Sequence, residues 1–230
     1  MCGRYTIIVS LEELIVRFQI DEWNAAHYKP RYNLAPGQAV YAVVEDHEGK
    51  HRLGELKWGL VPSWSKDEKS GFKMINARAE TADIKPAFKM LLERKRCLIP
   101  ADGYYEWKKT ENGAKQPYRF RLKSGKLFAM AGLYDSWISP EGSRLSTCTI
   151  LTTVPNRLTG EVHDRMPVIL KPEHEGLWLN REIRSAEPLK PLFAPYPEDE
   201  METYPVDPRV GNVATEGPAC IELYTKLSIR

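Results

Sequence analysis

The alternation of apolar and polar residues changes its period along the chain, and each period predicts a different kind of element. Residues 11–18 carry apolar side chains at the three- and four-residue spacing of a helix. Ser10, with Glu13 three positions later, forms the pattern of a capping box at the start of that helix. Residues 3–9 are interpreted as a strand. The amino-terminal part is therefore predicted to be a strand followed by a capped helix.

Strand patterns dominate the rest of the chain, and turn residues separate them. Strands are predicted at residues 39–44, 52–58, 97–99, 104–108, 118–122, 127–137 and 145–152. Further helices are predicted from Pro86 to the basic run at 94–96, over 156–160 and over 172–180. Residues 28–37 are interpreted as a proline-punctuated loop, whereas residues 185–208 give no assignable element.

Many strands with a few short helices predict an α+β fold. We expect one domain over residues 1–230, with a curved or barrel-like antiparallel β-sheet as its core and short helices at its periphery. A chain of 230 residues is long enough to bury one sizeable core. The sequence contains no internal repeat, low-complexity tract or evident linker.

Charge narrows the choice of partners only slightly. Lysine and arginine number 33 against 31 acidic residues, which gives a formal net charge of +2. This excess is too small to attract a polyanion without specificity, so nucleic-acid binding would need a local basic surface. There is no basic leader before a long apolar run, and no segment approaches the ~18 apolar residues that span a bilayer. We therefore expect a cytoplasmic protein with no membrane partner.

The four cysteines, Cys2, Cys97, Cys148 and Cys220, are widely separated. No Cys-x-x-Cys pair or Cys/His cluster has metal-ligand spacing, so we expect neither a metal nor another cofactor. In a reducing cytosol, three of these thiols are predicted to be buried and inert. Cys2 differs because its position gives it chemistry that an internal cysteine lacks.

Removal of Met1 would leave a free α-amine and a thiol on Cys2. Their ordinary pKa values are about 7.7–8.0 and about 8.5, so both groups are partly nucleophilic near neutral pH. An aldehyde can form an imine with this amine, and the thiolate can then add to the imine carbon and close a thiazolidine ring. The simpler interpretation is that Cys2 is only a small residue at the start of a strand.

Three other polar residues lie in settings that suit catalysis. Glu106 lies among aromatic residues in the run GYYEW, where desolvation would raise its pKa and suit it to general acid–base catalysis. His163, in the run VHDRMP, could transfer a proton near neutral pH. Asn76, in the run INARAET, could orient a substrate through its amide. Simpler interpretations are an outward-facing strand glutamate, a solvated loop histidine and an asparagine that caps a turn.

Taken together, these motifs resemble the SRAP family, the SOS-response-associated peptidases or abasic-site-processing proteins. The matching runs are CGRY at 2–5, NLAP at 33–36, WGLVPSW at 58–64, NARAET at 76–81, RCLIP at 96–100, GYYEW at 103–107, AGLY at 131–134, ILTT at 150–153 and HDRMPVIL at 163–170. Their order and spacing cover residues 2 to about 170, and the last sixty residues add no recognised motif.

The resemblance implies a catalytic set of Cys2, Asn76, Glu106 and His163. It implies that Cys2 forms a covalent thiazolidine crosslink with the ring-opened aldehyde of an abasic site in single-stranded DNA, which protects the site from strand cleavage. His163 would donate the proton that opens the sugar ring, and Glu106 would move protons as the carbinolamine loses water. Asn76 would hold the sugar or the amine in place. The imine intermediate makes the protein a latent abasic-site lyase.

Single-stranded DNA needs arginines for its phosphates and apolar groups that stack on or wedge between its bases. Within the recognised motifs, the candidates for phosphate contacts are Arg4, Arg78 and Arg165, and those for base contacts are Asn33, Pro36 and Trp64. An arginine in a structural ion pair and a tryptophan in the core are the simpler interpretations. We expect a monomer that joins the nucleoid when it binds DNA, and no protein partner is inferred.

Two other functions stay open on the sequence. In the first, Cys2 attacks a peptide carbonyl, with His163 as its base, and the protein is a thiol peptidase that acts on itself or on other chains. In the second, the protein is a noncatalytic module that binds single-stranded or gapped DNA. A crosslink that survives denaturation would distinguish the predicted function from both.

Overall fold

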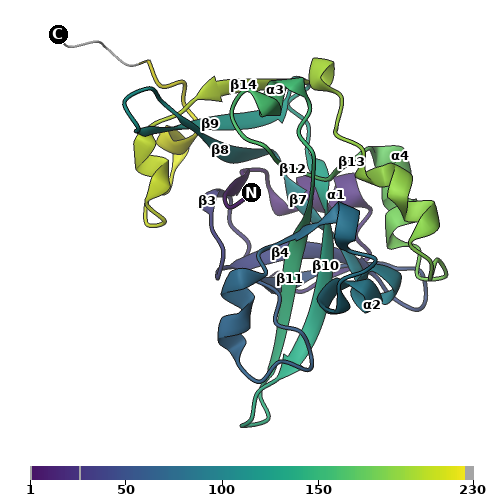
Figure 1. The fold of residues 1–230 in the computed structure, drawn as a ribbon. Helices are drawn as coiled ribbons and strands as arrows, with labels where there is room; N and C mark the ends of the chain where they lie inside the picture. Colours follow the sequence, from purple (N-terminus) through teal and green to yellow (C-terminus); the bar gives the residue numbers. More distant parts are fainter. Residues whose placement is uncertain (1, 26, 226–230) are drawn as a thin grey trace.

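The structure, a computed structural model, describes residues 2–25 and 27–225, and its strands form two sheets (Figure 1). The first sheet has the order β14 (Met201–Pro205), β9 (Lys115–Leu122), β8 (Gly103–Lys109), β1 (Tyr5–Ile7) and β3 (Arg31–Leu34). The second has the order β12 (Met166–Pro167), β11 (Arg144–Thr153), β10 (Phe128–Ile138), β7 (Arg96–Ala101), β4 (Ala39–Glu45), β5 (His51–Trp58) and β2 (Glu22–Trp23). Two short strands pair with this second sheet, β6 (Asn76–Arg78) with β11 and β13 (Ile169–Leu170) with β10.

The second sheet closes into a barrel. Its strands from β11 through β10, β7 and β4 to β5 pair in antiparallel fashion, and β5 then pairs with β11 in parallel. In this last pairing Lys57 lies opposite Thr147 and Trp58 opposite Cys148. Closure satisfies backbone groups that would otherwise form a free edge. The predicted α+β fold with a barrel-like sheet is confirmed, although one of its pairings is parallel.

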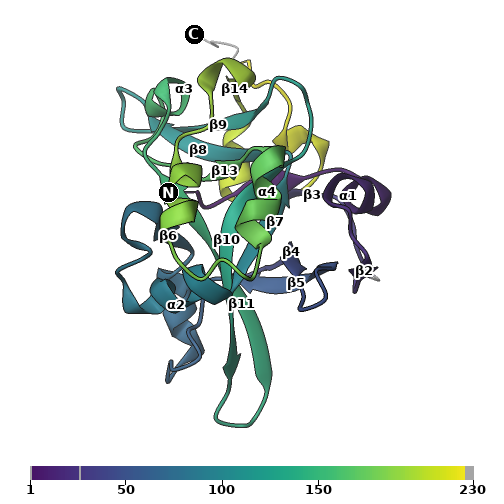
Figure 2. The same cartoon turned by 90° about the vertical axis from the view of Figure 1, so that its right-hand side faces the viewer.

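Helices cover the outside of the sheets (Figure 2). They are α1 (Leu11–Phe18), α2 (Pro86–Arg94), α3 (Arg157–Gly160) and α4 (Pro172–Leu179), with 3-10 helices at η1 (Glu68–Lys73), η2 (Ala79–Thr81), η3 (Glu187–Phe193), η4 (Glu198–Glu200), η5 (Pro208–Gly211) and η6 (Pro218–Cys220). The predicted capping box is present, because the Glu13 N–H donates to the Ser10 hydroxyl and the Ser10 N–H donates to the Glu13 carboxylate. Within the described part of the chain, no helix is both long and apolar enough to cross a membrane.

Two strands of the first sheet were not predicted from the sequence. The segment interpreted as a loop, 28–37, contains β3, and the unassigned segment 185–208 contains β14. β3 pairs with β1, and β14 pairs with β9. Both strands form at positions where a neighbouring strand supplies hydrogen bonds, a long-range effect that local residue preference does not contain.

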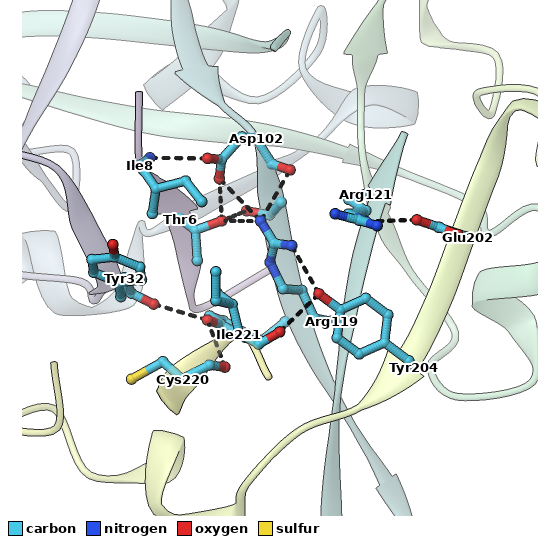
Figure 3. A network of polar contacts seen from close by, with 12 residues as sticks. Thr6, Ile8, Tyr32, Asp102, Arg119, Arg121, Glu202, Tyr204, Cys220 and Ile221 are labelled. Carbon is cyan, nitrogen blue, oxygen red and sulfur yellow. Dashed lines mark hydrogen bonds and ion pairs between the residues drawn. The ribbon is translucent and has the colours of Figure 1, made fainter. Parts of the chain in front are cut away.

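A buried polar network fixes β1, the strand that follows Cys2 (Figure 3). The carboxylate of Asp102 accepts hydrogen bonds from the Thr6 hydroxyl and from the backbone N–H of Ile8, the latter at 2.9 Å. The guanidinium of Arg119 lies 3.3 Å from the same carboxylate and donates to Thr6 at 3.1 Å. Because Asp102 and Arg119 are both almost fully buried, their charges are paired rather than solvated. The network ties the amino-terminal strand to β8 and β9.

Candidate active site

Cys2 lies immediately before β1 and is fully buried. Burial, followed by the negative charge of the Glu106 carboxylate, raises the pKa of the Cys2 thiol well above its ordinary value. The backbone N–H of Arg4 hydrogen-bonds the sulfur and acts in the opposite direction. The thiol is therefore protonated at neutral pH, and Glu106 is close enough to influence it.

Glu106 and His163 face one another from different parts of the chain. Glu106 lies on β8 and is 3% exposed, whereas His163 lies in the loop between α3 and β12 and is half-buried. The Nε2 atom of His163 is 3.8 Å from Oε2 of Glu106. Burial raises the pKa of Glu106 to about 7 and lowers the pKa of His163. Near neutral pH the pair can therefore both accept and donate a proton.

The backbone around His163 orients its ring. The N–H of Arg165 donates to Nδ1 of His163 at 3.0 Å, and the N–H of His163 donates to the carbonyl of Thr159 at 2.8 Å. The exposed carboxylate of Asp164 lies 3.1 Å from the same Nδ1. Nδ1 also lies 3.3 Å from the carbonyl of Arg165, so it accepts or donates according to the tautomer of the ring, while Nε2 is the atom that faces Glu106.

Two residues beside this pair were not predicted from the sequence. Tyr104 is fully buried, and its hydroxyl lies 3.0 Å from Oγ1 of Thr159. Thr159 in turn accepts the backbone N–H of His163, so hydrogen bonds run from β8 to the His163 loop. Tyr104 and Glu106 are two residues apart on one strand and therefore share a face. That spacing is visible in the run GYYEW, whereas nothing in the sequence marks Thr159.

Asn76 lies on β6, directly opposite Ile150 of β11. Its Nδ2 donates to the Ile150 carbonyl at 3.4 Å. Its Oδ1 is buried and has no hydrogen-bond partner among the described residues. A buried acceptor of this kind is a site where a ligand group can supply the missing bond. The structure thus brings Cys2, Glu106 and His163 together, while Asn76 lies on β6, a short strand of the second sheet.

The predicted DNA contacts fall into two groups. Arg78 and Trp64 are exposed, the latter at 66%, and Pro36 is half-exposed in the turn after β3. Arg78 ends β6, two residues after Asn76. These three side chains are available for contact with a nucleic acid.

Arg4 and Asn33 have internal partners instead. The guanidinium of Arg4 donates to Oδ1 of Asn33 at 3.0 Å and to the backbone carbonyls of Val210 and Gly211 at 2.6 and 3.0 Å. Asn33 is fully buried, and its Nδ2 donates to three carbonyls of the carboxy-terminal segment. The side chain of Asn33 is therefore held inside the protein, and its contact with bases stays a prediction that this geometry does not favour. Together the two residues hold the segment after β14 against the start of β1 and against β3.

Arg165 is also turned inward. Its guanidinium makes a bidentate ion pair with Glu80, at 2.6 and 2.9 Å, and donates to the Thr152 carbonyl at 2.5 Å. Its side chain is 10% exposed. The structure gives this arginine an ion pair, which was the simpler of the two interpretations of the sequence.

The other cysteines form no second reactive centre. Cys97, Cys148 and Cys220 are free and buried, and burial raises the pKa of each thiol. Among residues 2–25 and 27–225, no group of three or more histidine, cysteine or acidic side chains could hold a metal ion. The distinction of Cys2 lies in its position in the chain and in its neighbours.

Comparison with known proteins identifies relatives over nearly the whole chain. The sequence model of the SOS response associated peptidase (SRAP) family matches residues 1–213. Abasic site processing protein YoqW of Bacillus subtilis is 48% identical over 223 residues, covering 96% of this chain and 99% of that protein. Abasic site processing protein YedK of Escherichia coli is 32% identical over 227 residues, with the same coverage. A crystal structure of a protein from Bacteroides thetaiotaomicron has a TM-score of 0.88 at 26% identity, covering 97% of this chain and 100% of that one.

Proposed function

The chain belongs to the SOS response associated peptidase (SRAP) family, and on this basis we propose that it processes abasic sites in single-stranded DNA by forming a covalent crosslink through Cys2. One observation supports this most: Cys2, the residue that Met1 removal would leave at the terminus, lies beside the buried Glu106 carboxyl group, which itself faces His163. The relatives named above carry the name of abasic site processing proteins.

The proposed reaction uses both functional groups of the terminal cysteine. The α-amine of Cys2 attacks the aldehyde carbon of the ring-opened sugar and gives a carbinolamine, which loses one water to become an imine. The sulfur then bonds to the imine carbon, and the thiol proton ends on the nitrogen. The net change is the loss of one water, and no phosphodiester bond is broken. Ring closure also consumes the imine, from which β-elimination would cut the strand.

Glu106 and His163 suit the proton transfers in this sequence. A carboxyl group with a pKa of about 7 can take a proton from the attacking amine and return it to the departing hydroxyl. In the tautomer that carries its proton on Nε2, a neutral His163 can protonate the sugar ring oxygen as the hemiacetal opens. The free Oδ1 of Asn76 can accept a hydrogen bond from the sugar or the amine, which supplies orientation.

The same environment favours the amine over the thiol as the first nucleophile. A thiol peptidase needs a thiolate paired with a base at rest. Here burial keeps the Cys2 thiol protonated. The Nε2 atom of His163, the base that a peptidase would use, faces the Glu106 carboxyl group. A free α-amine has a pKa of about 7.7–8.0, so it is partly neutral at physiological pH. Arg78, Trp64 and Pro36 are the proposed DNA contacts around this site.

The function is tested with an oligonucleotide that contains one abasic site. We expect an adduct that survives denaturation, with the mass of the protein without Met1 plus the oligonucleotide minus one water. Cys2→Ala keeps the amine but lacks the thiol, so the adduct should be lost and strand cleavage should rise. Glu106→Gln should slow adduct formation by roughly 10²–10⁴-fold. The matched control, Cys220→Ala, should react at the wild-type rate.

A second experiment tests the α-amine of Cys2 separately from its thiol. Cys2 is retained, but its nitrogen is blocked by a leader that cannot be removed. An amide nitrogen does not condense with an aldehyde, so the stable adduct should vanish while binding to undamaged single strands persists. Full crosslinking by a protein whose blocked terminus is verified by mass spectrometry would contradict the mechanism. If the protein with the blocked Cys2 nitrogen still cleaves other peptides, the thiol peptidase hypothesis would be favoured instead.

A further inference from the structure

We propose that Asp135 and Trp137 are positioning residues for Trp64, the exposed aromatic side chain proposed to contact bases. They hold the backbone of the loop of residues 61–65, which contains Trp64. The contact between Trp64 and DNA rests on the proposed function, whereas the effect on the loop does not. Asp135 and Trp137 are both buried, and neither needs to touch DNA for this role.

The carboxylate of Asp135 lies on β10 and is bound at both of its oxygens. The backbone N–H of Ser63 donates to Oδ2 at 2.8 Å, and the ammonium group of Lys95 donates to Oδ1 at 2.6 Å. The backbone N–H of Ser136 also donates to Oδ1, at 2.9 Å. Burial by itself would raise the pKa of Asp135, but these three hydrogen bonds together keep the pKa below its ordinary value. Asp135 is therefore ionised at neutral pH, and one of its oxygens binds the loop.

Two further side chains on the same face of the long β10–β11 hairpin bind the loop at alternate residues (Figure 1). Thr147 lies opposite Asp135, and its hydroxyl accepts the N–H of Val61 at 2.9 Å. Trp137 is two residues after Asp135 on the same strand and so shares its face. The indole N–H of Trp137 donates to the carbonyl of Ser65 at 2.7 Å. The hairpin thus holds the loop backbone at residues 61, 63 and 65.

Trp64 lies between two of these held positions and is 66% exposed. An exposed aromatic ring is what a protein uses to stack on the bases of a single strand. A mobile loop would have to be ordered when DNA binds, and the lost backbone entropy would weaken the affinity. A loop that is held before DNA arrives avoids this loss. The hydrogen bonds of the hairpin therefore favour binding through Trp64.

The same loop adjoins the strand that carries Asn76. Leu60, directly before the loop, donates its N–H to the carbonyl of Met74 at 3.1 Å. The indole N–H of Trp58 donates to the carbonyl of Ile75 at 2.9 Å. The segment that leads into the loop is thus bonded to the segment that leads into β6. Trp64 is therefore on a loop connected to the candidate active site and not on a remote surface.

A structural ion pair with Lys95 is the simpler interpretation of Asp135. The side chain of Lys95 is 41% exposed, and ion pairs with a solvated partner contribute little to stability. This interpretation also gives no role to Oδ2, the oxygen that binds Ser63. The two interpretations differ in whether the loss of Asp135 weakens DNA binding through Trp64.

The first experiment measures the loop without DNA. Hydrogen exchange of backbone amides, resolved by NMR, reports on the N–H of Ser63. We expect this amide to be protected in the wild type and to exchange about tenfold faster in Asp135→Ala, which removes its acceptor. Asp135→Asn retains an acceptor oxygen and should restore most of the protection. Unchanged exchange at Ser63 in Asp135→Ala would overturn the proposal.

The second experiment measures the affinity for an undamaged single-stranded oligonucleotide by fluorescence anisotropy. Asp135→Ala should weaken binding about 5–30-fold, because the loop must then be ordered as DNA binds. In a protein that already carries Trp64→Ala, the same change should weaken binding little further, because both substitutions act through one side chain. Asp135→Asn should bind nearly as tightly as the wild type. Equal weakening by Asp135→Ala with and without Trp64 would contradict the inference.

Asp46→Ala is the matched control. The carboxylate of Asp46 also accepts two backbone N–H groups, those of Glu48 and Lys50, and it also binds a cationic side chain, that of Arg52. These contacts lie in the turn between β4 and β5, away from the loop. The control should therefore keep the wild-type affinity and the wild-type exchange at Ser63. An equal loss of affinity in Asp46→Ala would show a general effect of lost stability and would count against the proposal.

The outcomes separate this inference from the proposed function. If the wild type binds single strands but forms no adduct with an abasic site, the proposed function fails, and the pair of substitutions at Asp135 and Trp64 still decides the inference. If it binds no DNA, exchange at Ser63 decides whether Asp135 holds the loop. Should Asp135→Ala fail to fold, Trp137→Phe answers the same question, because it keeps an aromatic ring but removes the N–H that binds Ser65.

Discussion

Glu106 is a carboxylic acid almost completely removed from water, and its protonation connects stability with function. Burial is the largest cause of its raised pKa of about 7. In the unfolded chain an ordinary glutamate titrates at about 4.3. Between these two values the folded protein therefore binds a proton that the unfolded chain releases. A group useful for proton transfer at neutral pH is thus also a source of pH-dependent instability.

Glu106→Gln should reveal this linkage. The stability that comes from the raised pKa is fully present below about pH 4.3 and is lost as the pH rises through about 7. The whole shift corresponds to about 4 kcal/mol, and most of it falls between pH 5 and pH 8. Relative to Glu106→Gln, the wild type should therefore lose about 3 kcal/mol of unfolding free energy between pH 5 and pH 8. Urea unfolding at several pH values measures the difference.

An exposed glutamate supplies the comparison for this measurement. Glu48→Gln changes a side chain that is 54% exposed, so its unfolding free energy should follow the wild type at every pH. Parallel curves for wild type and Glu106→Gln would contradict the raised pKa and weaken the case for Glu106 as the proton-transfer group.

At the scale of elements, β1 depends on its neighbours. It has three residues, and it is held by pairing with β3 and β8 and by the network of Asp102 and Arg119. Arg119 lies directly against Gly103 at the start of β8: an added Cβ there would be 2.7 Å from its Nε and 2.9 Å from its Cζ. The glycine is needed because the guanidinium is buried and bonded and cannot move aside.

Gly103→Ala should therefore destabilise the protein by about 1–3 kcal/mol, the usual cost of overpacking. The variant should also slow adduct formation, since β1 positions Cys2. Thermal unfolding and the crosslinking assay measure the two effects. Gly54→Ala on β5 is the matched control, because its Cβ would meet nothing within 4 Å. Equal melting temperatures for the two variants would show that the Arg119 side chain moves to accommodate the extra methyl group.

At the scale of the whole molecule, a net charge of +2 provides little overall attraction for DNA. Binding must therefore depend on where individual charges lie. Several arginines are used internally, among them Arg4 and Arg165. Arg78, exposed at the end of β6, is the phosphate candidate from the sequence that is left free for a ligand.

Arg78→Gln should weaken binding to undamaged single strands of any sequence, because phosphates carry no sequence information. Removing one phosphate interaction should flatten the plot of log affinity against log salt by about 0.7. Fluorescence anisotropy over a range of salt concentrations measures this slope. Arg144→Gln is the control, since this exposed residue begins β11 in the hairpin that extends away from the amino terminus (Figure 1). A salt slope equal to that of the wild type would show that Arg78 does not contact a DNA phosphate.

The sequence by itself determined the features that depend on neighbouring residues. Helical spacing and the pair Ser10 and Glu13 specified α1 and its cap, and alternation specified the long strands of the barrel. The chemistry of Cys2 follows from its position in the chain, and the aromatic residues around Glu106 predicted its desolvation. These properties are local, because capping, periodicity and peptide chemistry act over a few residues.

Only the tertiary structure decided which distant groups meet. Local sequence cannot specify β3 or the parallel closure between β5 and β11, since each requires a partner strand from elsewhere. The hydrogen bond between Arg4 and Val210 joins residues 206 positions apart, and that between Arg165 and Glu80 joins residues 85 positions apart. An arginine has the same charge and reach whether it meets a phosphate or a carboxylate, so its role depends on what the fold brings beside it.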